Sequence, residues 1–121
     1  MSTVTAVPTV INNSAQQALW ETLTTTADTG SGIELSSHAD RSFHAVGTFG
    51  SGGTVDIQGS NDGTNWALLK DPFGNDLQLN ASAPLAALTE ATRYVRPLIS
   101  AGDGTTDIDV YMYARMTRTP T

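Results

Sequence analysis

Cysteine is absent from this chain of 121 residues, which excludes disulfides, thiolate nucleophiles and cysteine-based zinc sites. Charged residues are also scarce, at 15% of the sequence, so Ser, Thr, Asn and Gln must cover most of the surface. No hydrophobic run approaches the length needed to cross a bilayer, and the first residues lack the positive region of a signal peptide. We therefore expect no membrane partner.

Positive charge is the scarcer sign, with 6 Lys and Arg against 12 Asp and Glu and a formal net charge of -6. The basic residues are scattered along the chain and form no cluster. An acidic balance repels phosphate backbones, so we expect no nucleic-acid partner.

The stretch from 45 to 70 predicts a β-hairpin that organises the rest of the fold. Val55 and Ile57 alternate with polar residues, which is typical of a strand with one buried face. Asp62-Gly63 then marks a tight turn, because glycine accepts the positive φ that such turns need. Trp66 begins the return strand, and we expect it to be buried against Val55, Ile57, Ile108 and Val110.

Short alternating segments separated by Gly- and Asp-rich turns recur along the whole chain, without a convincing helix. The clearest runs from 107 to 116, where Ile108, Val110, Met112, Ala114 and Met116 alternate with polar residues and tyrosines. Pro97 predicts an edge position or a bulge for the strand over 92–100. About eight short strands predict an all-β, antiparallel β-sandwich, and we favour a jelly-roll-like arrangement.

Residues 1–14 are uncharged, β-prone and interrupted by Pro8. Proline donates no ladder hydrogen bond, so the segment is expected to be an extended arm or an edge strand. We predict an N-terminal arm over 1–14 and one sandwich domain over 15–121. The arm's apolar side chains suit a partner surface, and we expect it to reach away from its own sandwich onto a neighbouring subunit: Val4, Val7, Val10 and Ile11.

Residues suited to catalysis form no recognisable set, so we expect no enzyme, no catalytic residue, no cofactor and no metal. His38 and His44 are too few for a zinc site and are interpreted as surface imidazoles. The glycine-rich run over 50–53 lacks the lysine and following helix of a phosphate loop. Two clusters of Asp and Asn residues are possible calcium ligands: Asn61, Asp62 and Asn65, and Asp103, Asp107 and Asp109. Asp and Asn are also ordinary turn formers, and we favour that interpretation.

Exposed aromatic residues favour a binding role. Tyr111 and Tyr113 share the outward face of the last strand and are candidate partner-contacting residues. A sugar-stacking platform built from several aromatics is the alternative: Trp20, Trp66, Tyr94, Tyr111 and Tyr113.

Two segments carry a family resemblance: VGTFGSGGTVDIQGSNDGTNWALL and LTEATRYVRPLISAGDGTTDIDVYMYAR. Together they resemble small structural proteins of tailed bacteriophages, over about half of the chain between Val46 and Arg115. The S-N-D-G-x-x-W turn also occurs in discoidin-like and other sandwich adhesion modules, but no match to discoidin sugar- or lipid-binding loops is present.

The resemblance implies a capsid decoration (cement) protein, made in the host cytoplasm and located on the virion. Its implied partner is the major capsid protein, and it implies a homo-oligomer, with a trimer favoured. Such a protein stabilises a capsid by burying complementary surface across neighbouring subunits. A carbohydrate-binding or adhesion sandwich is the alternative function.

Overall fold

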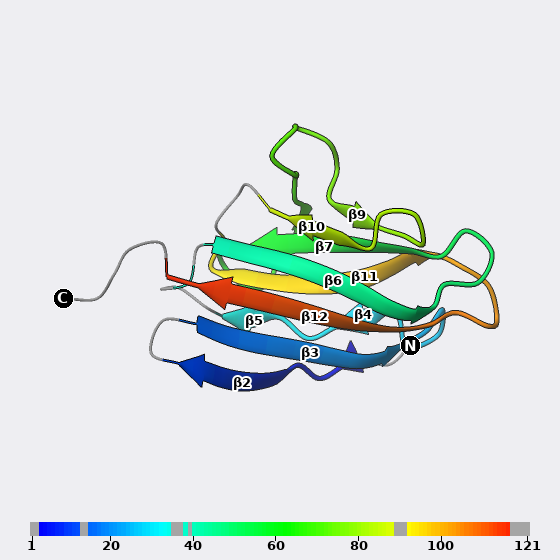
Figure 1. Cartoon of the computed structure of the whole chain (residues 1–121), viewed down its shortest axis with the longest axis horizontal. Coiled ribbons are helices and arrows are strands. Elements are labelled where there is room, and N and C mark those ends of the chain that lie inside the picture. Colours follow the sequence, from blue (N-terminus) through cyan, green and yellow to red (C-terminus); the bar gives the residue numbers. More distant parts are fainter. Residues whose placement is uncertain (1–2, 13–14, 35–37, 39, 89–91, 117–121) are drawn as a thin grey trace.

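The computed structural model describes residues 3–12, 15–34, 38, 40–88 and 92–116, and in these residues the chain is all-β. Two sheets pack face to face as a β-sandwich (Figure 1). The strands are β1 (Thr3–Val4), β2 (Val7–Asn12), β3 (Ala15–Leu23), β4 (Thr29–Gly30), β5 (Ile33–Glu34), β6 (Asp40–Thr48), β7 (Thr54–Ser60), β8 (Ala67–Leu68), β9 (Gln78–Leu79), β10 (Leu85–Ala87), β11 (Tyr94–Ala101) and β12 (Asp107–Arg115). No helix in the described part of the chain is long and apolar enough to span a membrane.

The first sheet has the order β1-β4-β11-β7-β8, with β5 also pairing β11 and β9 also pairing β7. The second sheet has the order β10-β6-β12-β3-β2. Apart from the parallel pair β1–β4, the neighbouring strands are antiparallel.

From β3 to β12 the chain crosses between the sheets at each connection except β4–β5, β7–β8 and β8–β9, which stay in the first sheet. The pair β4 and β5 and the pair β8 and β9 each fill one position beside a longer strand. That gives eight positions in two interleaved sheets, which is the jelly-roll-like sandwich that the sequence predicted.

Alternation along the strands builds the core between the sheets. On β12 the side chains of Ile108, Val110, Met112 and Ala114 are fully buried, as predicted. Trp20 of β3 is also fully buried, and its Nε1–H donates a hydrogen bond to the Ser31 carbonyl at 2.9 Å. Because Ser31 lies between β4 and β5 of the opposite sheet, this single side chain links the two layers through the core.

Pro97 lies in a central strand, so the predicted edge position is wrong. β11 sits between β7 on one side and β4 and β5 on the other. Opposite Pro97, the N–H of Ile57 bonds to the Leu77 carbonyl and its C=O accepts from Leu69, both on the side away from β11. Pro97 therefore has no ladder bond to lose on that side, and on its other side the partner strand is interrupted between β4 and β5. The predicted bulge does occur in β11, but further along, between Ile99 and Ala101.

The N-terminal segment is not an arm that reaches away from its sandwich. Its β1 residues pair with β4 in the first sheet, and β2 pairs with β3 as the edge strand of the second. Edge placement agrees with Pro8, which lies in β2, but the expected neighbour is the chain's own β3. The backbone N–H and C=O groups on this side of β3 pair with β2 of the same chain, so β2 does not need a neighbouring subunit as its partner. Residues 1, 2, 13 and 14 of the predicted arm lie outside the described residues.

Candidate functional site

The outer face of the second sheet carries a largely apolar row that crosses its five strands, here called the apolar row. Strand register aligns Tyr111 with His44 on one side and with Leu19 on the other. The row continues to Leu85 on β10 and to Val7 on β2. Leu85 is 62% exposed and Val7 is 52% exposed. Since the outer face of an antiparallel sandwich is usually polar, this row marks the face as a candidate binding surface.

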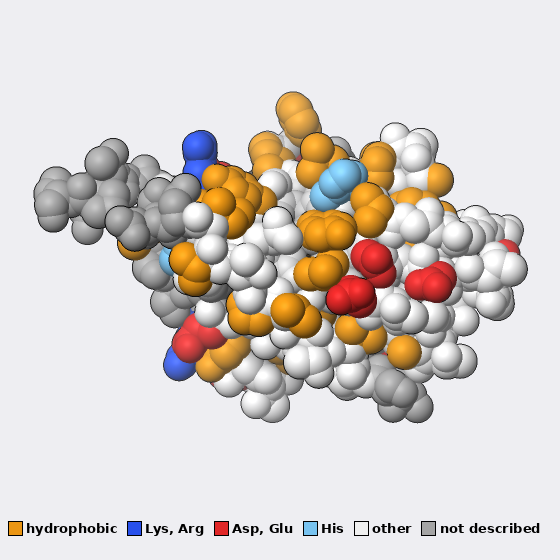
Figure 2. Space-filling model, turned by 60° about the horizontal axis from the view of Figure 1, so that its bottom comes forward, with side chains coloured by type: hydrophobic (Ala, Val, Ile, Leu, Met, Phe, Trp, Pro, Cys, Tyr) orange, Lys and Arg blue, Asp and Glu red, His pale blue; other side chains and the backbone are white. Residues whose placement is uncertain are grey.

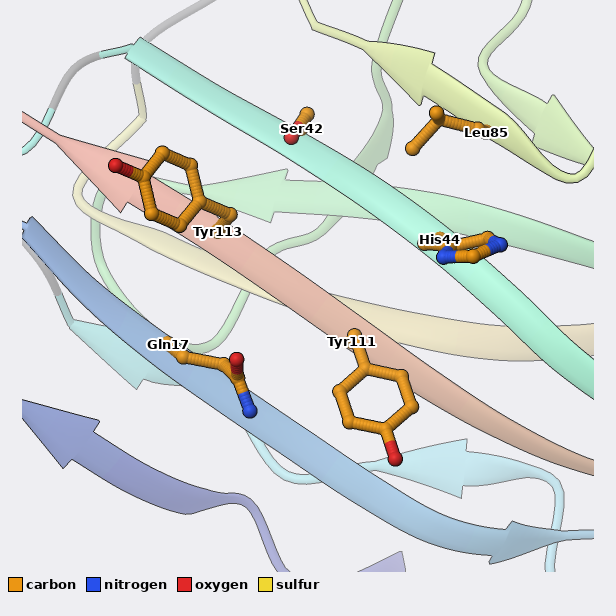
Figure 3. Close-up of a pocket in the computed structure, with 6 residues that line it drawn as sticks. All are labelled: Gln17, Ser42, His44, Leu85, Tyr111 and Tyr113. Atoms are coloured by element: carbon orange, nitrogen blue, oxygen red, sulfur yellow. The ribbon is translucent and has the colours of Figure 1, made fainter. Parts of the chain in front are cut away.

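A shallow hollow of about 380 Å³ lies along this row. Its lining is Gln17, Ser42, His44, Leu85, Tyr111 and Tyr113 (Figure 3). Figure 3 shows the two tyrosine rings pointing away from each other along β12, with Gln17 on the β3 side and Ser42 and His44 on the β6 side. The hollow thus combines aromatic faces with amide, hydroxyl and imidazole groups. Such a set can hold a partner by packing and hydrogen bonding.

The predicted partner-contacting tyrosines do share the outward face of the last strand. Tyr113 is 44% exposed and Tyr111 is half-buried. Figure 2 shows hydrophobic side chains spread over one side of the molecule around a histidine, with acidic side chains beside them. The sequence pattern therefore located these two residues on the surface correctly, while Gln17, Ser42 and Leu85 were missed because only strand register brings them together.

The four apolar residues of the N-terminal segment divide between two places. Val4 is partly buried and packs against the chain's own core, so it is not available to a partner. Val7, Val10 and Ile11 are exposed on β2, at 52%, 70% and 48%. Of these, Val7 is in register with Tyr111 through Leu19 and extends the apolar row.

Trp66 is not a core residue, and the prediction that it is buried against the inner faces of the strands is wrong. The pairing of Gln58 with Leu68 places both on the outer face, and Trp66, two residues before Leu68, falls on that face as well. Its ring lies 4.1 Å from the Arg96 guanidinium and is only half-buried. The indole also approaches Gly32 so closely that a Cβ there would lie 2.7 Å from it.

Two arginines on the outer face of the first sheet contact aromatic rings and polar groups. The Arg96 Nε–H donates to Gln58 Oε1 at 2.9 Å, while its guanidinium stacks on Trp66. Arg93 lies 5.1 Å from the Tyr94 ring and pairs with Glu34. These contacts hold Trp66 and Tyr94 against their own sheet, which makes this face a less open aromatic surface than the hollow on the second sheet.

His38 and His44 lie in different surroundings. His44 is exposed beside the hollow, as interpreted, but His38 is buried at 7% exposure, so its interpretation as a surface imidazole is wrong. Its backbone carbonyl accepts a 2.7 Å hydrogen bond from Nε of Arg41, a buried arginine whose Nη1 also donates to the Thr92 carbonyl at 2.7 Å. Burial lowers the pKa of Arg41. This cation ties two chain segments together at one end of the core.

Asp62 of the first candidate calcium cluster is surrounded by hydrogen-bond donors. Its Oδ1 accepts from the backbone N–H groups of Thr64 and Asn65, and its Oδ2 accepts from the Asn65 side chain. Ser60 donates its hydroxyl to the same carboxylate. These bonds, the one from the Asn65 backbone foremost, hold the pKa of Asp62 well below its usual range. The carboxylate builds the turn between β7 and β8.

Asp103, from the second candidate calcium cluster, also accepts several hydrogen bonds, and these join two loops. It accepts hydrogen bonds from the Thr105 hydroxyl and backbone N–H and, across the loops, from the Ser51 backbone N–H at 2.8 Å. These bonds, with the Thr105 hydroxyl contributing most, lower the pKa of Asp103 to about 2. Gly50, in the glycine-rich run over 50–53, has φ 70° and lies so close to Asp103 that a Cβ would be 2.3 Å from its Oδ1. The run is therefore part of a loop–loop contact.

Within the described residues, no three His, Cys, Asp or Glu side chains gather closely enough to hold a metal ion. Asp109, which the sequence grouped with Asp103 as a possible calcium ligand, instead accepts a hydrogen bond from the Thr22 backbone N–H at 2.9 Å.

Comparison with protein-family models and with curated proteins finds no match to this chain. The fold, the apolar row and the hollow beside it are therefore the features of this chain that bear on its function.

Proposed function

We propose that this chain is a non-enzymatic structural protein that binds other proteins through the outer face of its second sheet. The observation that carries the proposal is the apolar row, because aromatic and aliphatic side chains exposed in a continuous row are typical of protein interfaces. Tyr111 and Tyr113 supply rigid contact area that loses little side-chain entropy on binding. Leu85 and Val7 extend the contact to both edges of the sheet.

The partner in this proposal is the major capsid protein on the outer surface of a tailed-phage head, as the family resemblance suggests. The chain would bind as a homo-oligomer and stabilise the shell by burying surface across neighbouring capsid subunits. Apolar surface removed from water contributes roughly 25 cal/mol per Å² to the free energy of binding. Each bound copy therefore adds a small stabilisation, and many copies together stabilise a large shell. No catalytic step is involved.

The experiment is binding of the purified chain to expanded heads that lack it, with the copy number measured by quantitative gel analysis. We expect saturable binding at a copy number set by the head symmetry, and loss of binding in the Tyr111→Ser/Tyr113→Ser double variant. Tyr94→Ser is the matched control, since it removes a half-buried tyrosine from the other sheet. Circular dichroism checks that each variant is folded. Absence of binding by the wild-type chain, or equal loss in the control, would contradict the proposal.

The hollow itself favours a second candidate, a carbohydrate-binding module. Two tyrosine rings next to Gln17, Ser42 and His44 can stack on a sugar ring and hydrogen-bond its hydroxyls. A glycan array separates the two functions. Micromolar binding to a glycan that is abolished by Tyr111→Ala or Tyr113→Ala, with the fold intact, would support this candidate and count against the capsid proposal.

A further inference from the structure

The connection between β8 and β9 stands out from the body of the sandwich (Figure 1). Phe73 lies in this connection and is 88% exposed, the highest value among the large hydrophobic side chains of the described residues. An exposed phenylalanine that contacts only water gains nothing from its apolar surface. An exposed aromatic side chain is a candidate contact site if the loop that carries it has a fixed backbone conformation.

Hydrogen bonds within the connection hold that shape. Asp71 Oδ1 accepts from the backbone N–H groups of Phe73 and Asn75, at 2.9 and 3.0 Å. The Asp71 backbone donates to the Asn75 carbonyl at 2.9 Å, and Gly74 donates back to the Asp71 carbonyl at 3.0 Å. Gly74 has φ 84°, a conformation that glycine adopts without strain. The backbone that presents Phe73 is therefore preorganised, which lowers the entropy cost of docking it.

The base of the connection is closed as well. Lys70 and Asp76 form an isolated antiparallel bridge, and their side chains form an ion pair. The charges at this base are thus paired with each other, and Asp71 turns its carboxylate inward onto the turn. Little unpaired charge opposes the approach of an apolar surface to Phe73.

An apolar hollow of about 420 Å³ lies beside Phe73, between the connection and β10. Its β10 side is formed by Ala83, Leu85, Ala86 and Ala87. Its other side is formed by the connection and the start of β9: Asp71, Pro72, Phe73, Asp76, Leu77 and Gln78. The exposed Phe73 ring thus forms one wall of a hollow whose opposite wall, on β10, is aliphatic. Such a patch is self-complementary, which is the requirement for a two-fold symmetric contact.

We propose that this patch is an interface between two copies of the chain, with Phe73 of each copy inserted into the hollow of the other. The contact is isologous, so it closes at two copies, whereas the family resemblance implies a trimer. It involves the sandwich edge at β8, β9 and β10, shares Leu85 with the apolar row, and does not rest on the proposed capsid role. A contact made by one ring and one hollow from each copy is small, so we expect a weak, concentration-dependent dimer.

The test is sedimentation velocity of the purified full chain, from about 10 µM to about 1 mM, the range in which small interfaces associate. We expect the wild-type mass to rise from 12.7 kDa toward twice that value. Phe73→Ser, which removes the ring, and Ala87→Asp, which puts a charge in the hollow, should both stay at 12.7 kDa. Val10→Ser is the control, because Val10 is 70% exposed on β2, away from this patch. It should associate like the wild type.

Mixing the two defective variants gives a sharper result. A mixed pair keeps one contact, in which Phe73 of the Ala87→Asp copy meets the hollow of the Phe73→Ser copy, whose β10 wall is unaltered. We therefore expect an equimolar mixture to associate more than either variant alone. A monomeric wild type, a larger closed oligomer, unchanged association of Phe73→Ser, or a mixture no better than its components would overturn the proposal. Phe73-dependent binding to lipid vesicles with a monomeric wild type would assign the residue to a membrane instead.

Discussion

Among the described residues other than glycine, Thr22 is the one with a positive φ, and its backbone is therefore strained. Its φ is 61°, in the left-handed region that β-branched residues avoid. The strand register shifts here, between the pairs of Ile108 and Val110, so that Glu21 and Thr22 together oppose Asp109. The Asp109 carboxylate accepts the Thr22 N–H and stabilises this bulge. A strained residue is thus held in place by one hydrogen bond from the neighbouring strand.

Replacing Thr22 with glycine should raise the stability of the protein. Glycine adopts positive φ without the steric penalty, and relief of the strain is worth about 1 kcal/mol, partly offset by the greater freedom of the unfolded chain. Thermal melting measures the effect as a higher midpoint. The control is Thr48→Gly, at an exposed position of β6 with ordinary strand geometry, which should lower the midpoint. A lower midpoint for Thr22→Gly would show that the threonine side chain stabilises the bulge.

The two tryptophans should differ sharply in their contribution to stability. Trp20→Ala removes a fully buried side chain and its bond to Ser31, and should cost about 3–5 kcal/mol. Trp66→Ala removes a half-buried ring stacked on Arg96, and should cost about 1 kcal/mol. Denaturant unfolding of both variants measures the difference. Equal costs would place Trp66 in the core after all.

At the scale of elements, β2 is an integral edge strand of the second sheet. Deleting residues 1–12 removes the strand that pairs with β3 and also removes Val4 from its place against the core. We expect the truncated protein to melt at a clearly lower temperature than the full chain. This reverses the expectation for a free arm, whose removal would leave the melting temperature nearly unchanged. An unchanged midpoint would mean that β1 and β2 add no net stability.

The contact between the loops over 50–53 and 102–106 should depend on pH. The folded-state pKa of Asp103 is lowered to about 2, below its ordinary unfolded value. Its contribution to stability is therefore complete above the unfolded pKa near 4, and is lost as the pH falls from about 4 through about 2. Asp103→Asn should lower stability at neutral pH and flatten this acid dependence, as measured by melting at a series of pH values. Asp107→Asn, which removes the same charge from an exposed position on β12, should keep the wild-type acid dependence.

Alternation predicted the strands well because it reports the face of a strand directly. Ile108, Val110, Met112 and Ala114 occupy the core as expected, and Tyr111 and Tyr113 face outward. The face of Trp66 was not predictable in this way, since it depends on the register that the turn imposes on β8. The edge position predicted from Pro97 was wrong for a related reason. A central strand tolerates this proline because of the hydrogen bonds made by Ile57 and the gap between β4 and β5. The hollow also requires residues from four strands, which only register can align.

At the scale of the whole molecule, the strands that pair are far apart in the sequence. β3 and β12 are direct neighbours although they lie near opposite ends of the described chain. Closing such loops costs entropy before the contacts are made, so sandwiches of this kind fold on a timescale of about milliseconds to seconds. We expect stopped-flow refolding followed by tryptophan fluorescence to fall in this range. Complete refolding within microseconds would contradict the long-range pairing.

The position of β2 at the edge of the second sheet has a consequence for solubility. An edge strand offers unpaired backbone groups to any other strand, and side-by-side copies at high local concentration risk joining into aggregates. Pro8 removes one donor from this strand, and the shift in register between Val10 and Asn12 interrupts its regular geometry. The strand that exposes Val7, Val10 and Ile11 thus also carries features that oppose uncontrolled strand addition. Association is then left to side-chain contacts, which can close at a defined number of copies.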